Sequence, residues 1–155
     1  MNLFSSEVNN DLDGFNKTTS LLAASAKKDG EIVPEEVLVF VYDQILECLS
    51  QKAFLDADLN IARISKLINV PSYKISLAVN RIGNQNIKEL INRYRSEHAK
   101  VVLEDPNFWY YTIDAVGMET GFNNRVSFIN SFKKVAGITP HAFRVAIQES
   151  QKIAS

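Results

Sequence analysis

The 155 residues suffice for one hydrophobic core, and a hydrophobic content of 46% is typical of a globular protein. No apolar run reaches the roughly 18 residues that span a bilayer, so the sequence predicts no membrane contact within this chain. The net charge of −1 hides an asymmetry, because residues 1–59 carry −7 and residues 60–155 carry +6. A basic C-terminal part is expected of a nucleic-acid binder, but ordinary surface charge explains +6 equally well.

Residues 1–32 are rich in small polar and charged residues without sustained periodicity, which predicts a flexible leader or linker. Pro34 and the two acidic residues after it then predict the start of a helix over residues 35–52. Its broad apolar face has two explanations, burial within its own domain or a homodimer contact. This face comprises Val37, Leu38, Phe40, Val41, Ile45, Leu46 and Leu49.

Two short helices joined by a tight turn, a helix-turn-helix, are predicted between residues 60 and 82. Asn60 is expected to cap the first helix, Asn69 to take the left-handed conformation that ends it, and Pro71 to start the second. The apolar positions expected to face the core are Ile61, Ile64, Leu67, Ile68, Ile75, Ala78, Val79 and Ile82.

A long helix is predicted over residues 86–105, opened by a capping box between Asn86 and Glu89 and ended by Pro106. Twenty residues at about 1.5 Å each make a rod of roughly 30 Å. Its inward positions are predicted to be Ile87, Leu90, Ile91, Tyr94, Val101 and Val102. The aromatic run at 108–111 is expected to seal the core, with a partner or effector contact as the alternative.

A second helix-turn-helix is predicted over residues 112–136. Thr112 is expected to cap its first helix, Gly121 to form the turn, and Asn123 or Asn124 to cap the second helix. Gly137 then ends that helix, and Thr139-Pro140 starts another. The residues expected to pack inward are Ile113, Val116, Met118, Phe128, Ile129, Phe132 and Val135. An amphipathic helix of an ordinary bundle would show the same apolar stripe.

The two helix-turn-helix segments form a weak internal repeat. The first four matching residues recur 52 positions later, and two more recur 53 positions later. The pairs are Ile64 and Val116, Ser65 and Gly117, Asn69 and Gly121, Val70 and Phe122, Ile75 and Phe128, and Val79 and Phe132. Because the predicted helix between them is about as long as the 34 Å repeat of B-DNA, two reading helices are expected to enter successive major-groove segments.

No pattern of residues predicts catalysis, a metal site or a cofactor. His98 and His141 are isolated, and the sequence has neither metal-ligand spacing nor a phosphate-binding glycine loop. The chain is therefore expected not to be an enzyme. Its single cysteine, Cys48, cannot form an internal disulfide and fits a reducing, cytoplasmic location.

Two motifs carry a family resemblance. The first is Gly121-Phe122-(x)5-Phe128-(x)3-Phe132-Lys133-(x)3-Gly137-Ile138-Thr139-Pro140-(x)2-Phe143-Arg144, and the second is Tyr94-Arg95-(x)3-Ala99-(x)2-Val102-Leu103. Over about 95–110 residues the chain resembles the DNA-binding domain of AraC/XylS transcription regulators. The resemblance implies an all-α domain over 33–150, with about seven helices and two homeodomain-like helix-turn-helix subdomains joined by a long central helix. It also implies sequence-specific promoter binding.

The resemblance places base contacts in the exposed N-terminal half of each reading helix. In this sequence they are Arg125, Val126, Ser127 and Asn130 in the second unit and Tyr73, Lys74, Ser76 and Leu77 in the first. Arg125 has the donors to pair with guanine, Asn130 suits adenine, and Val126 suits a thymine methyl group. Expected phosphate contacts are Arg81, Asn123, Asn124, Lys133 and Lys134, and Lys74 is also placed for this role.

Three residues depart from the family pattern: Leu77 and Asn130 replace frequent polar or arginine residues, and Asn84 replaces a glycine. The low positive charge, Leu77 and the broad apolar face at 37–49 motivate an alternative function, a helical protein–protein interaction module on a degenerate helix-turn-helix scaffold. Double-stranded DNA is the expected partner, with RNA polymerase and a homodimer through residues 35–52 as further candidates. Residues 55–144 are also similar to family members that follow an N-terminal membrane domain, so the soluble part of a membrane-tethered regulator is one expectation.

Overall fold

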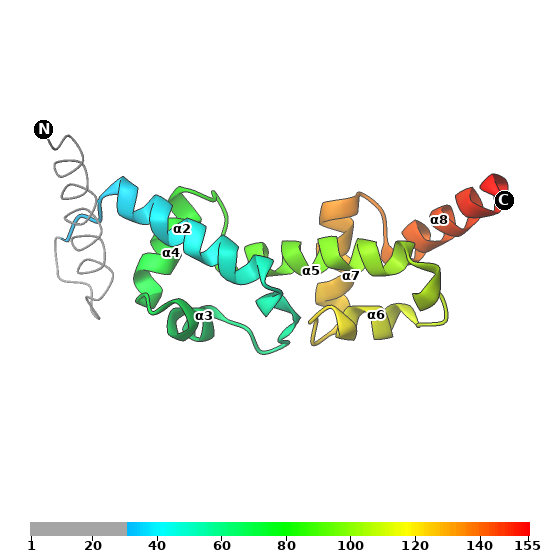
Figure 1. Cartoon of the computed structure of the whole chain (residues 1–155), viewed down its shortest axis with the longest axis horizontal. Helices are drawn as coiled ribbons and strands as arrows, with labels where there is room; N and C mark the ends of the chain where they lie inside the picture. The colour runs from blue at the N-terminus through cyan, green and yellow to red at the C-terminus, as the bar shows by residue number, and fades with distance from the viewer. Residues whose placement is uncertain (1–30) are drawn as a thin grey trace, which may run out of the picture. The chain divides into compact units, whose positions relative to one another are not determined.

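The computed structural model describes residues 31–155, where seven α-helices, two short 3-10 turns and no strands occur (Figure 1). The elements are α2 (Glu35–Ser50), η1 (Ala53–Leu55), α3 (Ile61–Ile68), α4 (Ser72–Arg81), α5 (Ile87–Glu104), η2 (Pro106–Phe108), α6 (Ile113–Glu119), α7 (Arg125–Ala136) and α8 (Pro140–Ala154). The predicted all-α fold is therefore confirmed. Apart from Glu31 and Ile32, the leader predicted at 1–32 lies outside the described residues. Over 31–155, no helix is both long and apolar enough to cross a membrane.

The described chain forms two compact units, and residues 31–48 and 61–84 belong to the first. Its core is made by α2, α3 and α4. The buried hydrophobic residues of this unit are Val33, Val37, Leu38, Val41, Ile45, Ile64, Val70, Ile75, Ala78 and Val79. Most of the apolar face of α2 is thus buried within the chain itself, which favours the first explanation of that face. Val39 and Phe40 remain 41% and 36% exposed.

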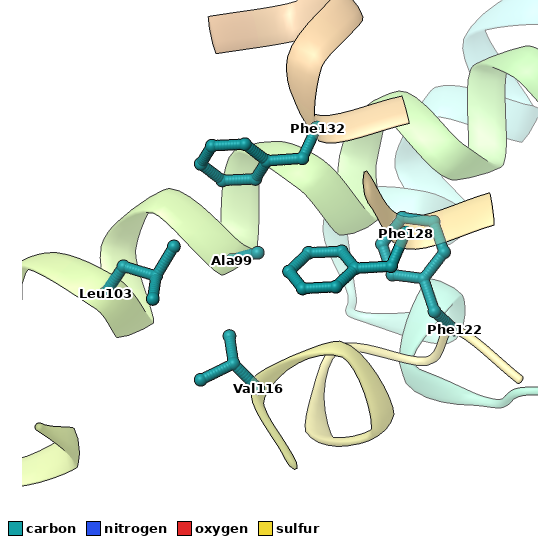
Figure 2. Packing of buried hydrophobic residues seen from close by; sticks show 6 residues of the cluster. All are labelled: Ala99, Leu103, Val116, Phe122, Phe128 and Phe132. Carbon is teal, nitrogen blue, oxygen red and sulfur yellow. The ribbon is translucent and has the colours of Figure 1, made fainter. Parts of the chain in front are cut away.

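The second unit comprises residues 49–60 and 85–155. Here α7 packs across α5, with α6 and α8 against the same helices. Figure 2 shows the core side chains pointing toward one another. They are Ala99 and Leu103 of α5, Val116 of α6, Phe122, and Phe128 and Phe132 of α7. The Phe128 and Phe132 rings meet edge to face with centroids 5.9 Å apart, a favourable geometry for aromatic pairs.

Most of the predicted helix starts are confirmed. Asn86 and Glu89 form both bonds of a capping box at α5, Thr112 accepts from the Ala115 N–H at 3.0 Å, and Thr139 accepts from the Ala142 N–H at 3.2 Å. At α7 the capping residue is Asn124, one of the two predicted candidates. These bonds join residues three apart, so their positions follow from the sequence alone.

The internal repeat is confirmed in backbone conformation. Asn69 and Gly121 both have positive φ, at 54° and 94°. The residue after each donates its N–H five residues back, from Val70 to the Ser65 carbonyl at 3.1 Å and from Phe122 to the Gly117 carbonyl at 2.9 Å. Each turn therefore ends its helix in the same way.

Three apolar residues predicted to pack inward are exposed instead, so those predictions were wrong. Leu67, Val101 and Met118 are 63%, 60% and 73% exposed. Helical periodicity indicates the centre of an apolar face, but not how wide a strip the neighbouring helices cover. The aromatic residues at 108–111 differ in burial. Tyr111 packs on the core of the second unit, as expected of a run that seals the core, whereas Tyr110 is 79% exposed.

Candidate nucleic-acid interface

The α7 helix of the second unit presents a polar face opposite its buried side. Asn124 caps its start by accepting from the Ser127 N–H at 2.8 Å, and Gly137 ends it with φ of 81°. Phe128 and Phe132 anchor the inner face. The exposed residues of the helix are Arg125, Val126, Asn130, Lys133 and Lys134. The helix is therefore held in place by its buried face, while its opposite face, here called the front, is exposed to solvent.

Five of the predicted contact residues share this front. Val126, Asn130 and Lys133 follow one another at spacings of four and three residues, so they form a single row along α7. Arg125 and Lys134 flank the row, and Ser127 is half-buried. The row combines an apolar group, an amide and a cation, which are groups that contact thymine methyls, adenine edges and phosphates respectively.

The start of α7 carries the two predicted asparagine contacts. Asn123 and Asn124 are both exposed, and the Asn124 Nδ2 donates to Asn123 Oδ1 at 3.1 Å. The Asn124 side-chain oxygen, Oδ1, accepts the capping bond from the Ser127 N–H. Since a helix N-terminus has free N–H groups and a positive dipole end, this position suits a phosphate.

Lys134 forms an ion pair with Glu89, a partner that was not predicted from the sequence. Its Nζ lies 3.2 Å from Glu89 Oε1, and its side chain is 75% exposed. The capping bond from the Asn86 backbone, followed by the bond and charge of Lys134, lowers the pKa of Glu89. Because the pair is exposed, its net contribution to stability is small, and a phosphate can replace the carboxylate at low cost.

Arg125 is also paired with a carboxylate, that of Asp114 on α6. Its Nη1 donates to Asp114 Oδ1, and the two side chains are 60% and 49% exposed. Sequence reasoning missed Asp114 as a site residue. The two residues are eleven positions apart, so only the folding of α6 against α7 brings them together.

In the first unit, Lys74 of α4, one of the predicted DNA contacts, has a buried side chain. The Lys74 side chain is 1% exposed, and its Nζ lies 3.9 Å from Glu31 Oε1. The neighbouring Tyr73 hydroxyl donates to Glu31 Oε2 at 3.0 Å. Burial, then this bond and the charge of Glu31, raise the Tyr73 pKa. A cation in this position cannot reach a base or a phosphate without leaving its site.

The remaining first-unit candidates are more accessible. Ser76 and Leu77 are half-buried, and Arg81 is exposed. Ser76 accepts from the Asn80 side chain at both its carbonyl, at 2.8 Å, and its hydroxyl, at 3.4 Å. Asn84 has the left-handed conformation expected of it, with φ of 50°. The first unit therefore offers fewer free polar groups on its reading helix than the second unit does.

Comparison with known families identifies this arrangement. The family model described as "Helix-turn-helix domain" matches residues 64–146, more than half of the chain. The chain belongs to the AraC-type helix-turn-helix domains. Domains of this family are DNA-binding regulators and not enzymes. Among curated proteins, no sequence matches this AraC-type chain.

Solved structures with the same AraC-type fold come from several bacteria. The C-terminal domain of the two-component response regulator yesN from Fusobacterium nucleatum is 20% identical with a TM-score of 0.56, over 66% of this chain and 96% of that one. The C-terminal domain of AraT, a response regulator from Geobacillus stearothermophilus, is 20% identical with a TM-score of 0.55, over 76% and 88%. An AraC-type transcriptional regulator from Chromobacterium violaceum is 16% identical with a TM-score of 0.57, over 68% and 92%.

Over residues 31–155, no group of three or more His, Cys, Asp or Glu side chains is placed to hold a metal ion. Three of the charged residues predicted to contact DNA, Lys74, Arg125 and Lys134, are each paired with a carboxylate. Glu31, Glu89 and Asp114 each face a predicted DNA-contacting residue.

Proposed function

We propose that the chain is a sequence-specific DNA-binding module of a transcription regulator, and that α7 is its principal reading helix. The observation that carries this proposal is the exposed row of Val126, Asn130 and Lys133 on a helix whose opposite face is fixed by buried phenylalanines. Such a helix can enter a major groove with its N-terminal half on the base edges. The predicted domain over 33–150 remains part of this proposal.

In the DNA complex, α4 and α7 would enter successive major-groove segments of a promoter. Arg125, Val126, Ser127 and Asn130 would read bases from α7, while Lys133, Lys134 and the two cap asparagines would contact phosphates. Tyr73, Ser76, Leu77 and Arg81 are the corresponding candidates in the first unit. Because Lys74 is buried, we expect the first unit to contribute less discrimination than the second.

Selection of bound sequences from a random DNA pool, followed by anisotropy titrations at several salt concentrations, tests this function. Affinity for the selected DNA should fall steeply as the salt concentration rises. Lys133→Ala removes one phosphate contact, so it should reduce the slope of log K against log salt concentration by about one. Lys152→Ala, at an exposed lysine on α8, is the matched control and should leave the slope unchanged. Asn130→Ala should lower discrimination at one base position by about 1–3 kcal/mol.

The exposed apolar groups of the first unit favour a second candidate function, protein binding on a helix-turn-helix scaffold. Leu67 is 63% exposed, and the one lysine of α4 is buried. RNA polymerase and a second copy of the chain are the candidate partners. Absence of DNA binding at low salt, across the whole selected pool, would favour this function over the first. Promoter binding itself would place the protein in the cytoplasm with the chromosome.

A further inference from the structure

The pair formed by Arg125 and Asp114 stands at the N-terminal end of the candidate reading helix. Arg125 is the first residue of α7, and Asp114 is in the first turn of α6. Both side chains are about half exposed, so the pair is accessible to a ligand. It lies beside the row of Val126 and Asn130 rather than in the core.

The position of Asp114 relative to α7 is fixed by the packing of α6. Thr112 caps α6 two residues before Asp114. Gly117, one turn later, lies so close to α7 that a Cβ there would be 2.8 Å from Phe128 Cδ1. The α6 backbone that carries Asp114 is therefore held close to the first turn of α7.

A small, mostly apolar hollow of about 120 Å³ lies at this junction. Its lining residues are Asp114, Gly117, Met118, Phe122, Asn123, Asn124, Arg125 and Phe128. The Arg125 side chain lines this hollow and is 60% exposed, so packing restricts it only on part of its surface. The bond to Asp114 supplies the constraint that packing does not.

A guanidinium with one nitrogen engaged by a carboxylate keeps donors on its other edge, because arginine has five N–H groups. Those donors match the O6 and N7 acceptors of guanine. The carboxylate adds a second effect, since it neutralises the local charge and repels phosphate. Together these effects direct Arg125 toward a base edge and away from the backbone.

We propose that Asp114 is a specificity-determining positioning residue, which orients Arg125 for guanine and suppresses its use as a non-specific phosphate contact. The proposal rests on the proposed DNA-binding function. It assigns a role to a residue that itself carries the wrong charge for DNA.

The test compares Asp114→Asn with the wild-type chain on selected DNA, on single-base variants of that DNA and on unrelated duplexes. In Asp114→Asn, discrimination at one base position should fall about 5- to 150-fold, while affinity for unrelated DNA rises and its salt slope steepens by about one. Arg125→Ala should lose discrimination at the same position, and the double variant should lose no more than Arg125→Ala does. Urea unfolding checks that each variant is folded, and midpoints close to that of the wild-type chain are expected because an exposed ion pair contributes little to stability.

Glu119→Gln is the matched control, because it removes one negative charge from the same helix, five residues after Asp114. It should leave base preference unchanged. If the wild-type chain selects a sequence and Asp114→Asn keeps the same base preference, the positioning role of Asp114 is overturned. The proposed DNA-binding function would still stand in that case. A wild-type chain that selects no sequence would instead overturn the proposed function itself, and the role of Asp114 with it.

Discussion

Gly121 lies directly against the carbonyl oxygen of Phe54: a Cβ at Gly121 would be 2.3 Å from that oxygen and 2.9 Å from Arg95 Nε. The backbone φ of Gly121 is 94°, a value that residues with a side chain rarely adopt. The turn between α6 and α7 therefore needs glycine for its conformation and for its space. It also packs against η1, a segment some 65 residues earlier in the chain.

Gly121→Ala is expected to lower the free energy of unfolding by at least about 2 kcal/mol, because backbone strain and a clash with backbone atoms add together. Gly137→Ala is the matched control. Gly137 has φ of 81°, but a Cβ there would meet nothing within 4 Å. That variant should lose only about 1 kcal/mol, the conformational cost alone. If urea unfolding shows that the two variants lose the same free energy of unfolding, Gly121 has no packing role.

Arg95→Lys is expected to destabilise the second unit by about 2–4 kcal/mol. Arg95 is 7% exposed, and it donates through Nε to the Phe54 carbonyl at 2.8 Å and through Nη2 to the Asp56 carbonyl at 2.7 Å. Burial lowers its pKa, whereas the charge of Asp56 opposes this change. An ammonium group cannot bond both carbonyls in the directions that the planar guanidinium reaches. Thermal unfolding should show the loss, and an unchanged midpoint would contradict it.

Acidification should destabilise the protein through His98. Burial, followed by the charge of Lys52, lowers the His98 pKa below its usual value of 6.5. The unfolded chain therefore binds this proton more readily than the folded one does. The stabilising contribution is complete above pH of about 6.5 and is lost as pH falls through the folded pKa.

Urea midpoints at pH 7.5 and pH 5.5 measure this effect. His98→Gln should show a smaller fall in stability between these values than the wild-type chain. His141→Gln, at an exposed histidine, should behave like wild type. If His98→Gln keeps the full pH dependence, another group is responsible for it.

Lys74→Met is expected to leave DNA affinity and its salt slope unchanged in anisotropy titrations, because a buried ammonium group does not reach a phosphate. The Lys74 Nζ is buried and has no hydrogen-bond partner among residues 31–155, where Glu31 Oε1 lies 3.9 Å away. Because this variant removes one partner of a buried ion pair and keeps the Glu31 carboxylate, we expect it to lower the free energy of unfolding, which urea unfolding measures separately from binding. A loss of affinity comparable to that of Lys133→Ala would restore Lys74 as a DNA contact.

Much of the fold was predictable because its signals are local. The capping residues Asn86, Thr112 and Thr139 bond three residues ahead, and Asn69 and Gly121 end their helices through their own backbone conformations. The internal repeat added the inference that both segments share one architecture. The position of α7, with Phe128 and Phe132 on its inner face, followed from periodicity alone.

The candidate site was less predictable because it depends on contacts between distant segments. The sequence by itself determined the helices, their ends and the polar front of α7, since these follow from bonds and periods within a few residues. Only the tertiary structure decided that Glu31 faces a buried Lys74, that Leu67 stays exposed and that Asp114 engages Arg125. The physical reason is that burial and ion pairing depend on which surfaces pack together, and no spacing along one helix specifies its neighbour.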